Sequence, residues 1–302
     1  MSIEVSQVTR LFGMQKALNN ATFSVGKGEI VGLLGPNGAG KSTMMKILTC
    51  YLPQTQGEAV VCGFNVVTHP MDVRRRVGYL PEHNPLYSDM YVKEYLGFID
   101  GIHKSSKNSA ARVEEMIDLV GLRPEVGKKI GSLSKGFRQR VGLAQAMIHD
   151  PEVLILDEPT SGLDPNQLEE IRGLILQMGR SKTVLLSTHI MQEVKAVCDR
   201  VIIINRGEIV ADTPTQKVHL LHQTNRIIKV EFDKPLADES QLIFSGVAEV
   251  VRAGGAIYRI FTRSTHDLRP EIFRFAVDNN LVILGLGVEE QSLEEVFRQI
   301  TI

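Results

Sequence analysis

The chain has 302 residues, of which 43% are hydrophobic and 23% are charged, as in an ordinary globular protein. Its 34 basic and 35 acidic residues give a formal net charge of −1, so no overall positive field draws it to nucleic acid or anionic lipid. Three cysteines, Cys50, Cys62 and Cys198, lack CxxC spacing, which argues against a disulfide framework or a zinc site and favours a reducing cytoplasm.

No apolar stretch approaches the roughly 18 residues that a membrane span needs, and candidates such as residues 281–288 have the length of a strand. The N-terminal sequence, MSIEVSQVTR, lacks the basic and apolar regions of a signal peptide, so we expect none. A role at a membrane would therefore require another chain to supply the membrane part. The length itself predicts one large domain and a smaller one.

The first predicted elements are strands that lead to a glycine-rich loop. Residues 3–5 and 21–25 have the apolar pattern of strands, with a turn near Gly13 between them. Residues 30–34 are an apolar run typical of a buried strand, and a helix is predicted from Lys41. The loop between them reads GPNGAGKST and comprises Gly35, Pro36, Asn37, Gly38, Ala39, Gly40, Lys41, Ser42 and Thr43.

This context, a strand before the loop and a helix after it, indicates a phosphate-binding loop. Glycines let the backbone curl so that successive N–H groups point at phosphate oxygens, and the helix N-terminus adds partial positive charge. Lys41 would reach the β- and γ-phosphates, and the hydroxyl of Ser42 would bind Mg²⁺. The loop therefore predicts ATP and Mg²⁺ as cofactors.

The middle of the chain predicts helices followed by an acidic strand end. Residues 85–150 are mostly helical in pattern, with Gly121 as a stop after one amphipathic stripe (Val113, Met116, Ile117, Val120). Residues 154–158 read Leu-Ile-Leu-Asp-Glu, an apolar strand that ends in two carboxylates. Asp157 would hold Mg²⁺ indirectly and Glu158 would polarise the attacking water. Two such acids alone fit a solvated turn as well, but beside a phosphate loop they indicate hydrolysis.

Strands and helices then alternate, which predicts an α/β fold with a mostly parallel sheet covered on both faces. Asp164 and Pro165 have the form of an N-cap and a first helical residue. Strands are predicted at residues 183–187 and 201–204, and residues 213–216 have capping-box form and predict a further helix.

After about residue 225 the pattern restarts as a small α+β domain, for which a ferredoxin-like arrangement is one candidate. A helix carries Leu268, Ile272 and Phe275, a strand follows at 281–288, and the chain closes as an amphipathic helix with Leu293, Val296, Phe297 and Ile300. We therefore predict two domains, residues 1–224 and 225–302. The second contains no recognisable cluster of chemistry.

Residues 133–137, Leu-Ser-Lys-Gly-Phe, lie between the phosphate loop and the acidic strand and resemble the LSGGQ signature of ATP-binding cassette (ABC) proteins. The resemblance covers about residues 1–220 and includes every expected motif in order. It implies a P-loop NTPase cassette with a mostly parallel core sheet, an antiparallel β subdomain and a helical subdomain at about 85–150.

Matching the family's motifs assigns further roles by resemblance. Phe12 would stack on adenine, Glu82 in Tyr79-Leu80-Pro81-Glu82 would sense Mg²⁺ and γ-phosphate, and His189 would contact γ-phosphate as the switch histidine. Glu158 and His189 are thus the expected catalytic pair, and Ser42, Glu82 and Asp157 the expected Mg²⁺ residues. The loop expected to touch an opposite subunit is formed by Ser161, Gly162, Leu163 and Asp164, and the signature by Ser134, Lys135, Gly136 and Phe137.

Two departures from the family pattern stand out. Lys135 and Phe137 replace a glycine and the glutamine of the signature, and Lys135 adds a charge near the expected phosphate contacts. Glu82 stands where many relatives carry glutamine; it can still coordinate Mg²⁺, but it adds negative charge facing a triphosphate. We expect Glu82 to tune nucleotide affinity or coupling.

The resemblance implies a head-to-tail homodimer in which each ATP lies between one chain's phosphate loop and the other's signature. Movement of residues 85–150 would then reach integral membrane permease subunits, with the chain peripheral on the cytoplasmic, inner face of the cell membrane. The single cassette, the Gly-Tyr-Leu-Pro-Glu loop at 78–82, the C-terminal appendage and its closing SLEEVF resemble those of multidrug- and polymer-type exporters of the ABC-2 type. Residues 77–96, VGYLPEHNPLYSDMYVKEYL, resemble the ATP-binding subunit of the gliding-motility-associated exporter.

Two alternatives remain. The first is a soluble cassette ATPase that acts on a macromolecular complex, but such proteins usually carry two cassettes or a long coiled-coil insertion, and this chain has neither. The second is a nucleotide-binding regulator without turnover, against which the presence of both Glu158 and His189 argues.

Overall fold

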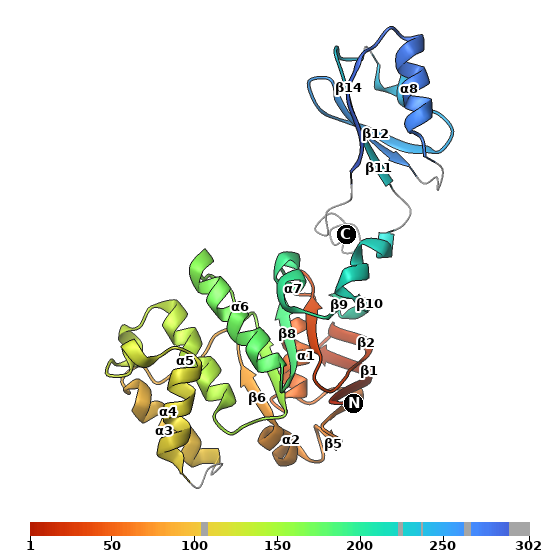
Figure 1. Cartoon of the computed structure of the whole chain (residues 1–302). Coiled ribbons are helices and arrows are strands. Elements are labelled where there is room, and N and C mark those ends of the chain that lie inside the picture. The colour runs from red at the N-terminus through yellow and green to blue at the C-terminus, as the bar shows by residue number, and fades with distance from the viewer. Residues whose placement is uncertain (104–107, 223–225, 237, 263–266, 290–302) are drawn as a thin grey trace. The chain divides into compact units, whose positions relative to one another are not determined.

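The computed structural model describes the chain except for residues 104–107, 223–225, 237, 263–266 and 290–302 (Figure 1). The chain divides into two compact units, one from Met1 to Gln216 and one that begins at Lys217. No helix among the described residues combines the length and the apolar character that crossing a bilayer would require.

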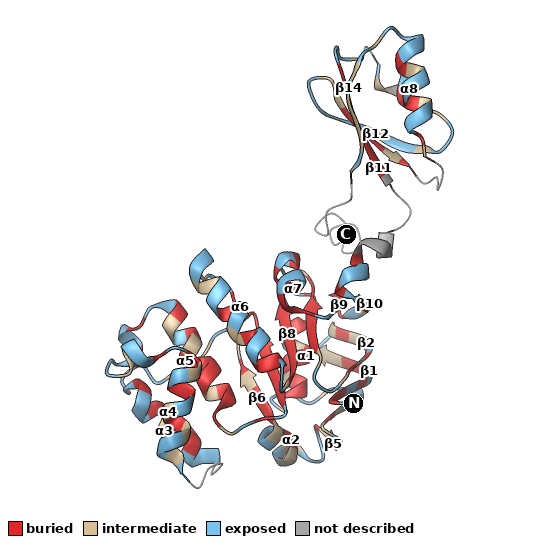
Figure 2. Ribbon diagram, viewed as in Figure 1, coloured by how far each residue is buried: buried red, intermediate tan, exposed pale blue. Residues whose placement is uncertain are grey.

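A six-stranded sheet in the order β10-β9-β3-β8-β7-β6 is the centre of the first unit. Five strands are parallel and β10 alone pairs antiparallel with its neighbour β9. The bounds are β3 (Ile30–Leu34), β6 (Val77–Leu80), β7 (Val153–Asp157), β8 (Thr183–Thr188), β9 (Arg200–Asn205) and β10 (Glu208–Pro214). Every residue of β3, β7 and β8 is buried (Figure 2), as expected for strands covered on both faces.

The two faces of this sheet are covered by different elements. On one face, Val31 and Leu33 of β3 join a core that includes helix α1 (Lys41–Leu48) and an antiparallel sheet. That sheet has the order β2-β1-β4-β5, with β1 (Ile3–Phe12), β2 (Gln15–Val25), β4 (Gln56–Val61) and β5 (Phe64–Asn65), and α2 (Pro70–Arg76) follows it. On the other face, Gly32 lies against Val194 and Cys198, so that α7 (Met191–Val197) packs closely there, next to α6 (Pro165–Gly179).

The helical region contains α3 (Val92–His103), α4 (Ser109–Leu119) and α5 (Lys135–Met147), with short 3₁₀ helices η1 (Arg123–Glu125) and η2 (Ile130–Ser132) between the last two. The predicted stripe on α4 is buried, and Gly121 follows the C-cap Val120 with a φ of 67°, which confirms the predicted stop. Asp164 caps α6 by accepting a hydrogen bond from the N–H of Gln167, as predicted.

The second unit contains one antiparallel sheet in the order β12-β13-β11-β14. Its elements are β11 (Arg226–Phe232), η4 (Glu239–Leu242), β12 (Val247–Gly254), β13 (Ile257–Thr262), α8 (Arg269–Asp278) and β14 (Ile283–Glu289). The fully buried Tyr258 and Phe232 pack with Ile272 of α8 in its core. The succession is that of a ferredoxin-like motif in which the 3₁₀ helix η4 replaces the first α-helix.

Three predictions need comment. Thr213 does not cap a helix; it belongs to β10, whose pairing with β9 continues to Pro214, and the helix that follows, η3 (Thr215–His222), is of the 3₁₀ type. The pairing of β10 with β9 fixes the backbone as a strand through residue 214, so Thr213 does not serve as a helix cap. The predicted closing helix with Leu293, Val296, Phe297 and Ile300 lies outside the described residues. The domain boundary at 224/225 stays a prediction.

Candidate active site

Several predicted site residues follow the carboxyl ends of neighbouring parallel strands. The glycine-rich loop follows β3, Glu82 follows β6, Glu158 follows β7 and His189 follows β8. Because parallel strands end at the same edge of a sheet, these segments meet there. They line a hollow of about 560 Å³, which also includes Phe12 and Ser161.

The loop conformation depends on glycine at particular positions. Gly40 has a φ of 109°, and a Cβ there would lie 2.5 Å from the carbonyl oxygen of Ala17. A Cβ on Gly35 would lie 2.4 Å from the carbonyl oxygen of Ile204. Helix α1 begins directly after Gly40 and no side chain caps it, which leaves its N-terminus open to an anion.

Lys41 is the cation of the site and is only 6% exposed. Its Nζ donates to the carbonyl oxygens of Gly35 at 2.7 Å and of Pro36 at 3.2 Å, and lies 3.5 Å from Oε1 of Glu158. A buried ammonium needs such partners because it has lost its water. These contacts fix the ammonium group of Lys41 beside the backbone of the phosphate loop.

Asp157 connects the loop to the central strands. Its Oδ1 accepts hydrogen bonds from the hydroxyls of Ser42 at 3.1 Å and of Ser187 at 2.5 Å. The hydroxyl of Ser42 and the carboxylates of Asp157 and Glu82 are oxygen ligands of the kind that Mg²⁺ prefers, and Ser42 and Glu82 both line this hollow. The described residues hold no cluster of three or more histidine, cysteine or acidic side chains that could bind a metal ion.

Glu158 and His189 are in direct contact. Nδ1 of His189 lies 3.0 Å and 3.1 Å from the two carboxylate oxygens of Glu158. The backbone of Glu158 has a φ of 49°, an uncommon conformation for a residue other than glycine, and its N–H donates to the hydroxyl of Ser187 at 3.0 Å. The carboxylate is therefore fixed between an imidazole and the ammonium of Lys41. Sequence reasoning assigned no role to Ser187; its place two residues before His189 was the available signal.

Phe12 ends β1 and lines the hollow with 46% of its surface exposed. The guanidinium carbon of Arg10 lies 4.7 Å from its ring centroid. A large exposed ring beside a polar hollow offers a face on which a nucleobase stacks.

The four signature residues, Ser134 to Phe137, do not line the hollow. Ser134 caps α5 through a hydrogen bond that its hydroxyl accepts from the N–H of Phe137 at 3.3 Å. Gly136 is buried, and a Cβ there would lie 2.6 Å from the side chain of Gln167. Lys135 is exposed, and its Nζ lies close to Gly162. A Cβ built on Gly162 would be 2.2 Å from that nitrogen. In one chain, the signature thus stands apart from the phosphate loop.

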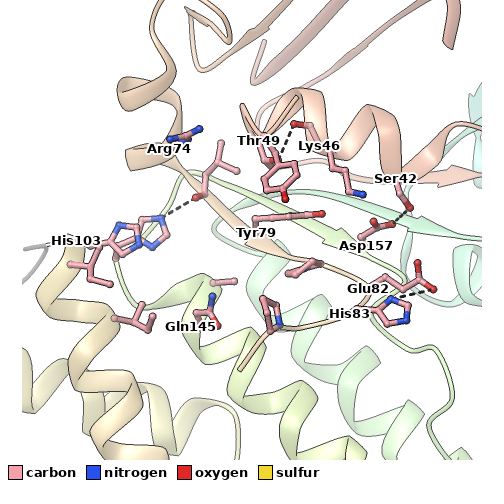
Figure 3. Close-up of a pocket in the computed structure, with 18 residues that line it drawn as sticks. Ser42, Lys46, Thr49, Arg74, Tyr79, Glu82, His83, His103, Gln145 and Asp157 are labelled. Atoms are coloured by element: carbon pink, nitrogen blue, oxygen red, sulfur yellow. Dashed lines mark hydrogen bonds and ion pairs between the residues drawn. The ribbon is translucent and has the colours of Figure 1, made fainter. Parts of the chain in front are cut away.

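A second hollow, of about 720 Å³, lies between the helical region and the segment after β6 (Figure 3). Apolar side chains such as Tyr51, Pro85, Ile99 and Ile102 line it, together with basic groups. Figure 3 shows Ser42 bonded to Asp157 at one end and His103 at the other. Both hollows include Ser42 and Glu82.

Comparison with known proteins decides the family. The sequence model of the family described as ABC transporter matches residues 18–161. The bacitracin transport ATP-binding protein BcrA of Bacillus licheniformis is 31% identical over 306 residues, covering 98% of this chain and 95% of that protein. The Nod factor export ATP-binding protein I of Burkholderia orbicola is 37% identical over 215 residues, or 70% of each chain.

The chain belongs to the ABC transporter ATP-binding proteins. A solved dimeric ATP-binding cassette in a post-hydrolysis state, bound to ADP and Pi, superposes with a TM-score of 0.65 at 25% identity, covering 70% of this chain and 98% of that one. The predicted cassette fold is confirmed. As an ABC cassette the protein binds ATP and hydrolyses it, and hydrolysis is coupled to transport.

Proposed function

We propose that the hollow of about 560 Å³ is the hydrolytic site and that its residues act as the family resemblance implies. One observation carries this proposal: Glu158 contacts both Lys41 and His189 beside the phosphate loop. Lys41 moves from the loop carbonyls and Glu158 to the β- and γ-phosphates, which frees the Glu158 carboxylate to accept a proton from water. His189 then bonds to the γ-phosphate.

The same proposal assigns the remaining groups. Phe12 stacks on adenine, and Ser42, Asp157 and Glu82 hold Mg²⁺, which neutralises charge on the phosphates when it is bound. The loop 35–43 contributes its backbone N–H groups, and in a low-dielectric site such fixed donors stabilise the charge that develops on the transferred phosphoryl group.

We propose further that a second copy completes each site. Residues 134–137 lie outside the hollow of their own chain, and the Ser134 hydroxyl acts as an acceptor in its cap, so its proton can be donated to the nucleotide of another chain. The solved relative described above is a dimer. In a head-to-tail pair, the signature would cover the γ-phosphate, and residues 161–164 would touch the partner. Lys135 would bring an additional positive charge to the seam.

Integral membrane permease subunits are the proposed partners at the second hollow. Its apolar lining suits a short amphipathic segment, and the shared Ser42 and Glu82 would connect that segment to the nucleotide. The Burkholderia relative is named for export, which supports an exporter. The ABC-2 type rests on the resemblance of the C-terminal appendage, and a role in gliding motility rests on the resemblance of residues 77–96. The chain would then be peripheral on the cytoplasmic face of the membrane.

Glu158→Gln tests the hydrolytic assignment. The change preserves size but removes the charge that accepts the proton, so we expect steady-state turnover to fall at least about 100-fold while ATP binding persists. The ATP-bound dimer should accumulate, as measured by light scattering during gel filtration. Glu169→Gln, an exposed glutamate on α6, is the matched control. Turnover of Glu158→Gln within a few-fold of the parent would remove Glu158 from the reaction.

A further inference from the structure

Glu193 is a buried carboxylate for which the proposed reaction has no use. It lies on α7, four residues after His189, and is only 3% exposed. A carboxylate that has lost its water must be compensated by hydrogen-bond donors or a cation. The question is what its donors hold in place.

Two threonine hydroxyls donate to it, one to each oxygen. Oγ1 of Thr160 donates to Oε1 and Oγ1 of Thr188 donates to Oε2, both at 2.5 Å. Both threonines are buried, with exposures of 4% and 0%. The hydroxyl of Thr188 also accepts a hydrogen bond from the N–H of Ile190 at 3.1 Å.

These donors come from the two segments that carry the site. Thr160 lies two residues after Glu158 and directly before the loop 161–164. Thr188 and Ile190 flank His189. The register between β7 and β8 ends at Asp157 and Ser187, and the N–H of Glu158 still donates to the carbonyl oxygen of Ser187 at 3.2 Å. Thr160 lies beyond this pairing, whereas Thr188 is the last residue of β8 and pairs with Leu34 of β3.

We propose that Glu193 is a positioning residue that joins the segment after β7 to the segment after β8 and so fixes His189 relative to Glu158. The inference rests on the proposed roles of Glu158 and His189, whose atoms approach to 3.0 Å. An error of about 1 Å in such a contact can lower a rate about 100-fold, so a brace at this point controls turnover. Because Thr160 precedes the loop 161–164, the brace also connects the partner-facing loop to the histidine.

The test uses the full chain and compares kcat and KM for ATP among Glu193→Ala, Glu193→Gln, Thr160→Val and Thr188→Val. We expect Glu193→Ala to lower kcat by about 10- to 100-fold with KM within about twofold, because the brace acts on geometry and not on ATP affinity. Glutamine keeps one acceptor oxygen and the same volume, so it should restore part of kcat. Lys195→Ala, an exposed change on the same helix, is the control.

Combined variants separate a brace from two unrelated contacts. If both hydroxyls act through Glu193, Thr160→Val and Thr188→Val lower kcat in the parent but leave it unchanged in the Glu193→Ala background. Circular dichroism and thermal unfolding report the folded fraction to which each kcat is normalised. If Glu193→Ala does not fold, the other three variants still test the inference. Thr160→Val, Thr188→Val and Glu193→Gln delete hydrogen bonds with little change in volume.

The inference is overturned if the two valine variants and Glu193→Gln all keep kcat within about twofold of the parent, since a purely structural cluster would alter only the melting temperature. It is also overturned if the valine changes lower kcat equally with and without Glu193. Glu158→Gln, assayed in parallel, distinguishes the two proposals. Its retained turnover refutes the proposed site, whereas its inactivity beside unaffected Glu193 variants refutes only the brace.

Discussion

The two hollows of the first unit differ in how they are built. The hollow at the phosphate loop is lined by loop backbone and by charged groups such as Lys41 and Glu158. The second hollow has a mainly apolar surface, to which side chains from separate elements such as Tyr51 and Ile102 contribute, and polar and charged side chains also line it. Burial, reinforced by the carboxylate of Asp157, raises the pKa of the Tyr79 hydroxyl on its wall.

This difference follows from what each hollow is suited to hold. A triphosphate is recognised by amide donors and a cation, which a short glycine-rich loop provides by itself. A protein segment is recognised by apolar area, which requires side chains from several elements. Ser42 and Glu82 line both hollows and so form a wall that the two hollows share. Each of the first three predictions below alters the phosphate-loop hollow, the second hollow or this shared wall.

The largest expected effect is at the phosphate loop. Lys41→Ala removes a charge-assisted contact with phosphate, so ATP affinity measured by calorimetry should fall about 10- to 100-fold. Lys46→Ala is the matched control, because Lys46 lies on the same helix but lines the second hollow. Unchanged ATP binding by Lys41→Ala would take the loop out of the nucleotide site.

The second hollow is tested by Ile102→Glu, which places a charge among its apolar side chains. We expect the variant to bind ATP with affinity within about twofold of the parent but to lose association with the membrane subunits in detergent-solubilised membranes. Leu176→Glu, an exposed apolar residue on α6, is the control. Equal recovery of membrane subunits with both variants would contradict the proposed docking site.

A smaller effect is expected at the common wall. Glu82→Gln removes one carboxylate near the triphosphate, which weakens Mg²⁺ coordination and also relieves repulsion of the phosphates. The Mg²⁺ concentration for half-maximal hydrolysis should therefore rise by about threefold. Magnesium titrations that superimpose on those of the parent would show that this departure from the family has no effect.

The smallest effect concerns the far end of the second hollow, where the rings of His103 and His149 stack at 4.0 Å. Burial, assisted by the charge of His103, lowers the pKa of His149 to about 4. At acid pH the unfolded chain therefore binds a proton at His149 that the folded chain does not. The contribution of His149 to the unfolding free energy is fully present above its ordinary pKa of about 6.5 and is lost as the pH falls toward about 4.

Replacing His149 by glutamine tests the direction of this pH dependence. His149→Gln should flatten the pH dependence of the unfolding free energy between about pH 6.5 and 4, measured by urea titration. His83→Gln is the control, since the side chain of His83 is 92% exposed. Equal slopes for His149→Gln and the parent would show that the stacked ring does not contribute.

The sequence by itself determined the features that depend on a few neighbouring residues. The phosphate loop, the acidic strand end, the cap at Asp164 and the stop at Gly121 were all predicted, because glycine sterics and local side-chain hydrogen bonds specify them. The parallel core was predicted for a similar reason, since the alternation of short apolar runs with helical stretches has few other solutions.

Tertiary structure alone decided the contacts between residues distant in the chain. The local pattern at Thr213 predicted a helix cap, but pairing with β9 made that residue part of a strand. The ion pair of Lys41 with Glu158 and the brace at Glu193 exist because the sheet order makes β8 the neighbour of both β3 and β7. Strand order depends on packing over the whole unit, and no short stretch of sequence carries that information.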